Sequence, residues 1–273
     1  MWGIEPVEMQ YLPKNVIYFL FYSMLGYVCE VVYCSIPAKR LVNRGFLHGP
    51  YLPIYGFGAL SMILLLSPYK ESPCRVFLSG MVLTGILEYL TGFLLEKLFH
   101  AKLWDYSSYR FNINGRVCLL NSTMFGILGV VVMYAVHPWI SRIVTYIPDN
   151  LLFPVSSAIL VVLAADTTAS VFHMSAFQER LGRIKALRGM LEERLEKLED
   201  LGPAVRGQLE AELERLKEQL RSKSKRILDA FPGFKSKEYE SQLAQVRKGL
   251  TDWRAEQKNK RRDARKKNDR GKH

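Results

Sequence analysis

The sequence predicts an all-α protein: a polytopic membrane helix bundle of about five spans, followed by a cytoplasmic helical region that resembles a coiled coil. Two observations support this prediction. About five long apolar segments lie within residues 1–175, and a bilayer core of ~30 Å requires ~20 apolar residues in a helix. Charge is also segregated: residues 174–273 hold 27 Lys and Arg against 17 Asp and Glu, a net of +10 out of +12 for the whole chain. We therefore expect three regions, namely a membrane bundle (1–175), amphipathic helices (176–257) and a basic disordered tail (258–273).

The predicted spans cover residues 15–36, 52–67, 74–96, 117–140 and 151–172. The first is expected to stay in the membrane, because residues 1–14 lack the basic start of a signal peptide and the apolar run is too long for one. The second span is the shortest, and a re-entrant or deeply buried helix is its alternative. Pro53 at its start is compatible with a helix, because an N–H in the first turn has no helical partner.

Lys and Arg placement predicts the orientation of the bundle. The loop after the first span carries Lys39, Arg40 and Arg44, the loop after the third carries Lys102, Arg110 and Arg116, and the tail is the most basic segment. With five spans these three stretches lie on one side. We therefore expect a bacterial inner-membrane protein with its N-terminus outside and its C-terminus in the cytoplasm.

Three acidic residues lie inside the apolar spans: Glu30, Glu88 and Asp166. A carboxyl group near the bilayer centre costs ~3 kcal/mol on insertion scales, so it is seldom without a role. In the expected orientation all three, together with Asn121, lie in the cytoplasmic half of their helices. They either join helices through hydrogen bonds or line a polar cavity open to the cytoplasm. For Glu88 the expected partners at compatible depth are Arg44, His48 and Asn121.

Two loops on the same side are dense in Gly, Pro and aromatic residues, which is typical of rigid, close-packed loops. The first, residues 43–56, contributes Arg44, His48 and Tyr55 as candidate substrate-binding residues. In the second loop, Asn114-Gly115 is a turn signal, and Arg116 at the start of the next helix suggests an anion site. An interfacial aromatic belt is the alternative for its aromatic residues. The candidates from this loop are Trp104, Asp105, Asn112, Asn114 and Arg116.

These loops resemble a bacterial family known as putative ABC-transporter permease type IV, the CmpB-like group. The matching stretches are R-G-x-x-x-G-P-x-x-P-x-Y-G-x-G at 44–58, the Glu at position 88, W-D-Y-S at 104–107 and N-I-N-G-R-V-C-L at 112–119. The resemblance covers about residues 15–175 and implies a polytopic inner-membrane transport protein.

In the tail, apolar residues recur at heptad spacing from Phe177 through Ile184 and Leu191. Gly202-Pro203 and the Phe231-Pro232-Gly233 turn divide the pattern into three stripes, the last running from Tyr239 to Trp253. This pattern predicts a folded-back set of amphipathic helices, with a homo-oligomeric coiled coil as the alternative. The final run of basic residues is too charged to be buried, and it either binds anionic lipid or is simply solvated.

The leading functional hypothesis is a permease or transport component whose polar cavity faces the cytoplasm. The alternatives are an intramembrane enzyme acting on a lipid or isoprenoid headgroup, with an arginine holding phosphate and Glu88 or His48 as acid or base, and a membrane-anchored scaffold. The sequence contains no P-loop pattern, no catalytic motif and no zinc or disulfide spacing among its four cysteines. We therefore assign no catalytic residue, metal or cofactor. The expected partners are the lipid bilayer, an ATPase subunit or other protein bound through the tail, or further copies of the chain. No specific nucleic acid is expected.

Overall fold

The computed structural model describes residues 12–39 and 41–196, together with separate residues between 207 and 251 (207, 208, 211, 214, 215, 218, 227, 228, 230, 231, 234–236, 238–244, 246–248 and 251). The chain divides into two compact units. The first comprises Met1–His173 with Asp229–Phe234, and the second comprises Met174–Leu228 with Lys235–His273.

Four helical segments in the described residues are long and apolar enough to cross a membrane. They are α1 (Leu12–Ala38), α3 (Pro73–Phe99), the continuous run Leu119–Thr145, and the first part of α6 (Asp149–Glu196). The run Leu119–Thr145 consists of α4 (Leu119–Val131), the π-helical segment η3 (Val132–Val136) and α5 (His137–Thr145). The predicted second span is the shorter helix α2 (Pro53–Leu66), which continues in the 3-10 turn η2 (Ser67–Tyr69). The all-α membrane bundle predicted from the sequence is therefore confirmed.

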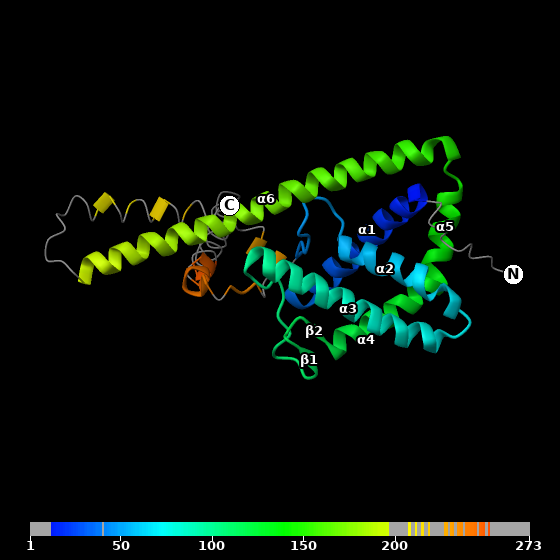
Figure 1. Ribbon diagram of the computed structural model, residues 1–273, viewed down its shortest axis with the longest axis horizontal. Coiled ribbons are helices and arrows are strands. Elements are labelled where there is room, and N and C mark those ends of the chain that lie inside the picture. Colours follow the sequence, from blue (N-terminus) through cyan, green and yellow to red (C-terminus); the bar gives the residue numbers. More distant parts are fainter. Residues whose placement is uncertain are drawn as a thin grey trace, which may run out of the picture. The chain divides into compact units, whose positions relative to one another are not determined.

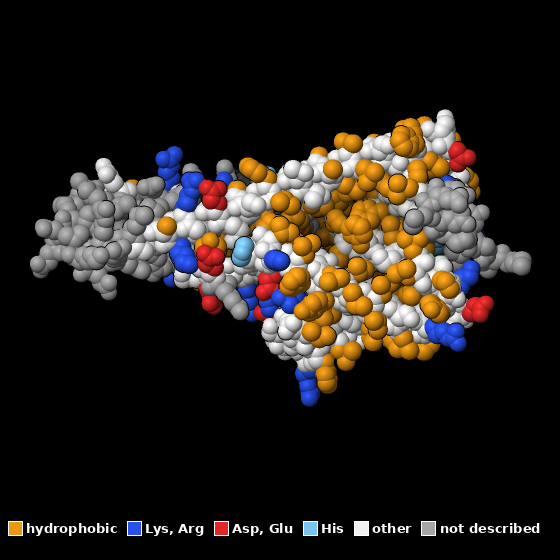
Figure 2. Space-filling view, viewed as in Figure 1, with side chains coloured by type: hydrophobic (Ala, Val, Ile, Leu, Met, Phe, Trp, Pro, Cys, Tyr) orange, Lys and Arg blue, Asp and Glu red, His pale blue; other side chains and the backbone are white. Residues whose placement is uncertain are grey.

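Apolar and polar side chains are arranged on α3 as a lipid-exposed helix requires. One face points outward with spacing of four residues, and the opposite face is buried against the bundle. Figure 2 shows hydrophobic side chains distributed widely over the visible face of this part of the chain. The outward residues are Leu78, Val82, Ile86 and Leu90, and the buried ones are Val76, Gly80, Thr84 and Glu88.

The bundle core lies toward the start of α1, where α1, α2, η3 and α5 pack together. Its central apolar residues include Ile17, Ile63 and Val144, each 3% exposed or less. Tyr22 is buried within this cluster, and its hydroxyl lies 2.6 Å from Nδ1 of His137. This hydrogen bond satisfies two buried polar groups that would otherwise weaken an apolar core. Figure 1 shows α2 between α1 and α3 in this part of the bundle.

Helix α2 is short because the loop before it covers part of the distance across the bundle. The loop, residues 41–52, begins with Val42 N–H bonded to Ser35 Oγ and ends with Leu52 N–H bonded to the Ser23 carbonyl. It therefore passes back along twelve residues of α1, or ~18 Å at 1.5 Å per residue. Helix α2 then continues antiparallel to α1 to reach Lys70, whose carbonyl accepts a hydrogen bond from the Tyr134 hydroxyl. The loop and α2 together therefore run along the bundle from the Ser35 end of α1 to Lys70.

A small β-hairpin precedes α4. Strands β1 (Asn112–Ile113) and β2 (Val117–Cys118) pair antiparallel. Asn114 and Gly115 both have positive φ, 53° and 68°, which is the type I′ turn that Asn-Gly favours. Residues 117 and 118 had been expected to begin the fourth span, but they form β2, and the helix begins at Leu119. The expected span began two residues too early because Val117 and Cys118 are apolar and buried. Hydropathy does not distinguish a buried strand from the end of a helix.

In the second unit, α6 continues without a break from the predicted fifth span into the tail, as far as Glu196. Phe177, Leu181 and Ile184 are each 2% exposed or less, as their heptad spacing indicates. Leu243 and Val246 of the third predicted stripe are also buried. The breaker Gly202-Pro203, the central stripe apart from Ile227, and the basic run 258–273 lie outside the described residues.

Candidate functional site

Glu30 on α1 joins the loop 41–52 to helix α2. Its Oε1 accepts a hydrogen bond from Arg44 Nε at 3.2 Å, and its Oε2 accepts one from the Tyr55 hydroxyl at 2.8 Å. Arg44 also donates to the Ala230 carbonyl at 2.9 Å, and its guanidinium lies 5.9 Å from the ring centroid of Phe231. Three of the candidate residues, Glu30, Arg44 and Tyr55, are therefore in direct contact, and the carboxylate has a cationic partner.

Asp166 on α6 holds the non-helical loop 41–52 in place. Its two oxygens accept hydrogen bonds from the backbone N–H of His48 (2.9 Å) and of Gly49 (2.8 Å), and from the Tyr51 hydroxyl (2.6 Å). The His48 ring adds a contact of 2.9 Å to the same carboxylate. Backbone groups that leave a helix at membrane depth require such partners, because lipid offers none. Asp166 and His48, both candidates from the sequence, thus act together on this loop.

Glu88 on α3 is 5% exposed and is contacted from the second loop. The Tyr106 hydroxyl donates to Glu88 Oε1 at 3.2 Å, while Asn121 Nδ2 on α4 donates to the Tyr106 oxygen at 2.5 Å. Burial and the nearby Glu88 carboxylate raise the pKa of the Tyr106 phenol, so it remains a donor. Of the expected partners, Asn121 lies in this network. No hydrogen bond joins Arg44 or His48 to Glu88 in the described residues, because Arg44 contacts Glu30 and His48 contacts Asp166.

Arg116, the expected anion-binding residue, is paired with a carboxylate. Its Nη2 lies 2.7 Å from Glu96 Oε2, and its Nη1 donates to the Tyr89 hydroxyl at 3.1 Å. Its backbone carbonyl accepts a hydrogen bond from Trp104 Nε1 at 2.9 Å. These contacts fasten the hairpin to α3 and leave the guanidinium engaged with a partner of opposite charge.

The remaining candidates of the second loop shape its turns. Asp105 Oδ1 accepts hydrogen bonds from the N–H and the hydroxyl of Ser107. Asn112 Oδ1 accepts one from Gly115 N–H at 3.0 Å, and Asn114 Nδ2 donates to the Tyr89 hydroxyl at 3.0 Å. All of these side chains bond to neighbouring protein groups, as in Asx turns, so their arrangement positions Tyr106 and the start of α4.

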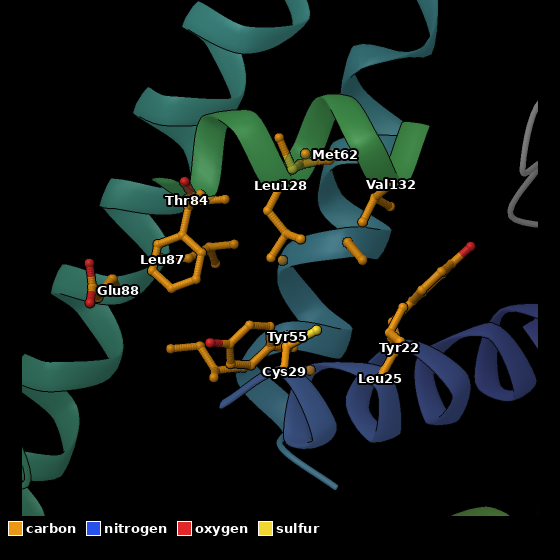
Figure 3. A pocket seen from close by; sticks show the side chains of 16 residues that line it. Tyr22, Leu25, Cys29, Tyr55, Met62, Thr84, Leu87, Glu88, Leu128 and Val132 are labelled. Atoms are coloured by element: carbon orange, nitrogen blue, oxygen red, sulfur yellow. The ribbon is translucent and has the colours of Figure 1, made fainter. Parts of the chain in front are cut away.

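A cavity of about 70 Å³ lies between α1, α2, α3 and α4, and it is open at its mouth. This volume is below the ~300–1,000 Å³ of sites that bury a drug-sized ligand, so a larger ligand would extend through the open mouth. Figure 3 shows Glu88 at one end of the cavity and Tyr22 at the other. The lining is mainly apolar. It consists of Tyr22, Leu25, Gly26, Cys29, Ile54, Tyr55, Gly58, Ala59, Met62, Thr84, Leu87, Glu88, Phe125, Leu128, Gly129 and Val132.

Polar groups that line the cavity are bonded, with one exception. Tyr22 bonds to His137, Tyr55 to Glu30, and Thr84 to the Gly80 carbonyl of its own helix. Glu88 Oε2 is buried and has no hydrogen-bond partner among the described residues. The cavity therefore places one unsatisfied carboxylate oxygen beside an apolar space.

The sequence had indicated Tyr55 and Glu88 but missed the other cavity residues, such as Leu25, Met62 and Phe125. Each of these belongs to an apolar span, so composition gives no signal that separates a cavity wall from a packed core. Within the described ranges, no group of three His, Cys, Asp or Glu side chains is arranged to hold a metal ion.

Comparisons with known proteins address the membrane part of the chain. Searches of curated proteins and of solved structures found no match. The family model described as putative ABC-transporter type IV matches residues 17–171. This range covers more than half of the chain and contains most of α1, all of α2 to α5, both loops and the first part of α6. The protein is thus a multi-pass membrane protein, and it belongs to the family of putative type IV ABC transporters.

Proposed function

We propose that this protein is the membrane component of a transporter and that its substrate occupies the cavity between α1, α2, α3 and α4. The observation that carries the proposal is the cavity itself: an apolar space at membrane depth that ends at a buried, unpaired carboxylate oxygen. Membership of an ABC-transporter family supports a transport role. The sequence led us to expect a polar cavity. The cavity that we propose as the substrate site instead has an apolar wall and a single polar end.

The two loops support this proposal by fixing the helices that line the cavity. Tyr55 is a cavity residue and is held by Glu30, while Glu88 is held by Tyr106 from the second loop. Each carboxylate therefore connects a loop to the cavity wall. We infer that displacement of either loop alters the cavity, which is how a partner at that end of the bundle would control the substrate.

An ATPase subunit is the proposed partner, because the chain has no P-loop pattern of its own. The proposed location is the bacterial inner membrane, with the N-terminus outside and the basic loops and tail in the cytoplasm. The geometry is less favourable to the lipid-headgroup enzyme. That alternative requires an arginine to hold phosphate, whereas Arg44 and Arg116 are each paired with a glutamate.

A cavity-filling substitution tests the proposal without knowledge of the substrate. Gly58 lines the cavity and has open space around it, so Gly58→Leu should fill the cavity with little strain. Gly189→Leu is the matched control, because Gly189 is also helical and open but lies outside the cavity. A deletion strain complemented with wild-type protein, Gly58→Leu or Gly189→Leu is compared by mass spectrometry of small molecules in cells and medium.

We expect at least one small molecule to depend on the wild-type protein for its distribution across the membrane. Gly189→Leu should restore that distribution, and Gly58→Leu should not. If Gly58→Leu, present at normal levels in the membrane, restores every wild-type distribution, the cavity is not the transport site.

A further inference from the structure

Glu88 differs from the other two intramembrane carboxylates in its partners. Glu30 is paired with the Arg44 guanidinium, and Asp166 is bonded by two backbone N–H groups, a tyrosine hydroxyl and the His48 ring. Glu88 interacts with two neutral groups, the Tyr106 hydroxyl and the Asn121 amide, and its Oε2 has no hydrogen-bond partner among the described residues. Glu30 and Asp166 therefore have cationic or several hydrogen-bonding partners, whereas one carboxylate oxygen of Glu88 has no hydrogen-bond donor among the described residues.

The cavity next to Glu88 contains no cationic side chain. None of its sixteen lining residues is Lys, Arg or His. A carboxylate in a low-dielectric interior is costly unless a cation or several donors compensate it. A ligand that brings a positive charge and an N–H donor to Oε2 would supply the missing partner.

The rest of the cavity wall is apolar and can contact the first part of such a ligand's body. Leu25, Met62, Leu87 and Leu128 offer apolar surface, and the rings of Tyr22, Tyr55 and Phe125 also line the space. Aromatic faces attract cations at short range, and more strongly when water is excluded. A free alkyl chain gains from leaving water, at about 0.8 kcal/mol per buried CH₂.

We propose that the cavity binds an amphipathic amine, with its ammonium group donating to Glu88 Oε2 and its apolar part running between α1, α2 and α4 and out through the open mouth. This inference names the substrate class of the transport site and rests on the proposed function. The ammonium is the recognised group, and it belongs either to a free single-chain amine or to the headgroup of a lipid such as phosphatidylethanolamine.

The test uses the full-length protein in nanodiscs of phosphatidylcholine, whose headgroup carries no N–H. The probe is radiolabelled dodecylamine, with empty nanodiscs as background, and the competitors are unlabelled dodecylamine and 1-dodecanol. We expect saturable binding that dodecylamine displaces at much lower concentration than dodecanol. Glu88→Gln should weaken probe binding at least about tenfold, as expected for loss of a hydrogen bond to a charged group.

Gly58→Leu should abolish probe binding, and Gly189→Leu should leave it unchanged. Gly58→Leu does not touch the carboxylate, so it still tests the site if Glu88→Gln fails to assemble. Displacement of the probe by added phosphatidylethanolamine supports a lipid source of the ammonium group, and displacement by free amines alone supports a soluble source.

The failures of the two proposals are distinguishable. If dodecanol competes as well as dodecylamine and Glu88→Gln binds like wild type, the amine inference is overturned, while a site blocked by Gly58→Leu remains. If Gly58→Leu binds the probe as tightly as wild type, the cavity is not the binding site, and both the inference and the proposed function are overturned.

Discussion

The role of Asp166 as the anchor of a non-helical loop makes a quantitative prediction. Asp166→Ala removes the acceptor of two backbone N–H groups, those of His48 and Gly49, and of the Tyr51 hydroxyl. Each N–H left without a partner costs about 1–3 kcal/mol when buried. The His48 side of the loop is partly exposed, so water replaces some of what is lost there. We therefore expect the free energy of unfolding to fall by about 3 kcal/mol, which is near the lower end of the sum of these costs.

The melting temperature of the full-length protein in detergent measures this loss. For a unit of this size, 1 kcal/mol corresponds to roughly 2–4 °C, so Asp166→Ala should melt about 6–12 °C lower than wild type. Asp166→Asn keeps one acceptor oxygen and should fall between the two. Thr168→Ala is the control, because Thr168 is exposed on the same helix and its hydroxyl bonds only within that helix. If Asp166→Ala melts together with Thr168→Ala, the loop does not depend on Asp166 and the reasoning is refuted.

Three further predictions concern the turn, the ion pair and the orientation. Gly115→Ala should lower the melting temperature, because Gly115 has φ +68° and a Cβ there would lie 2.5 Å from Asp105 Oδ1. A melting temperature equal to that of wild type would show that the turn can relax. Glu30→Leu should lower the free energy of unfolding by about 2 kcal/mol, because it leaves the Arg44 guanidinium without its carboxylate. The loss is smaller than for a fully buried pair because both side chains are partly exposed. The double variant Glu30→Leu, Arg44→Leu should recover part of the loss, and strictly additive losses would argue against coupling. In intact cells, an impermeant thiol reagent should label cysteine introduced at position 70 but not at position 110, and labelling at position 110 would reverse the proposed orientation.

Hydropathy and turn chemistry predicted much of the architecture. The apolar segments correspond to helices, and Asn114-Gly115 forms the turn that its composition favours. Helix ends were less predictable. Helix α6 continues to Glu196 because the residues after the span, such as Phe177 and Leu181, keep a helical apolar stripe. Nothing in that pattern marks where an apolar span ends and an amphipathic helix begins.

The candidate site was predicted in its parts but not in its pairings. Burial cost alone identified Glu30, Glu88 and Asp166 as residues that require partners. The partner of Glu88 was not predictable, because Tyr106 reaches it only when the second loop folds back against α3. A sequence of one chain contains no information on that distance. The cavity was also not predictable, since it arises from where four helices fail to fill the space between them.

The most direct test of the cavity and of Glu88 is a structure of the full-length protein determined by electron cryo-microscopy in lipid nanodiscs with dodecylamine. We expect density in the space between α1, α2, α3 and α4, with its polar end within hydrogen-bonding distance of Glu88 Oε2. A packed bundle without this space, or a Glu88 carboxylate paired with a lysine or arginine of the chain itself, would rule out the proposed binding site.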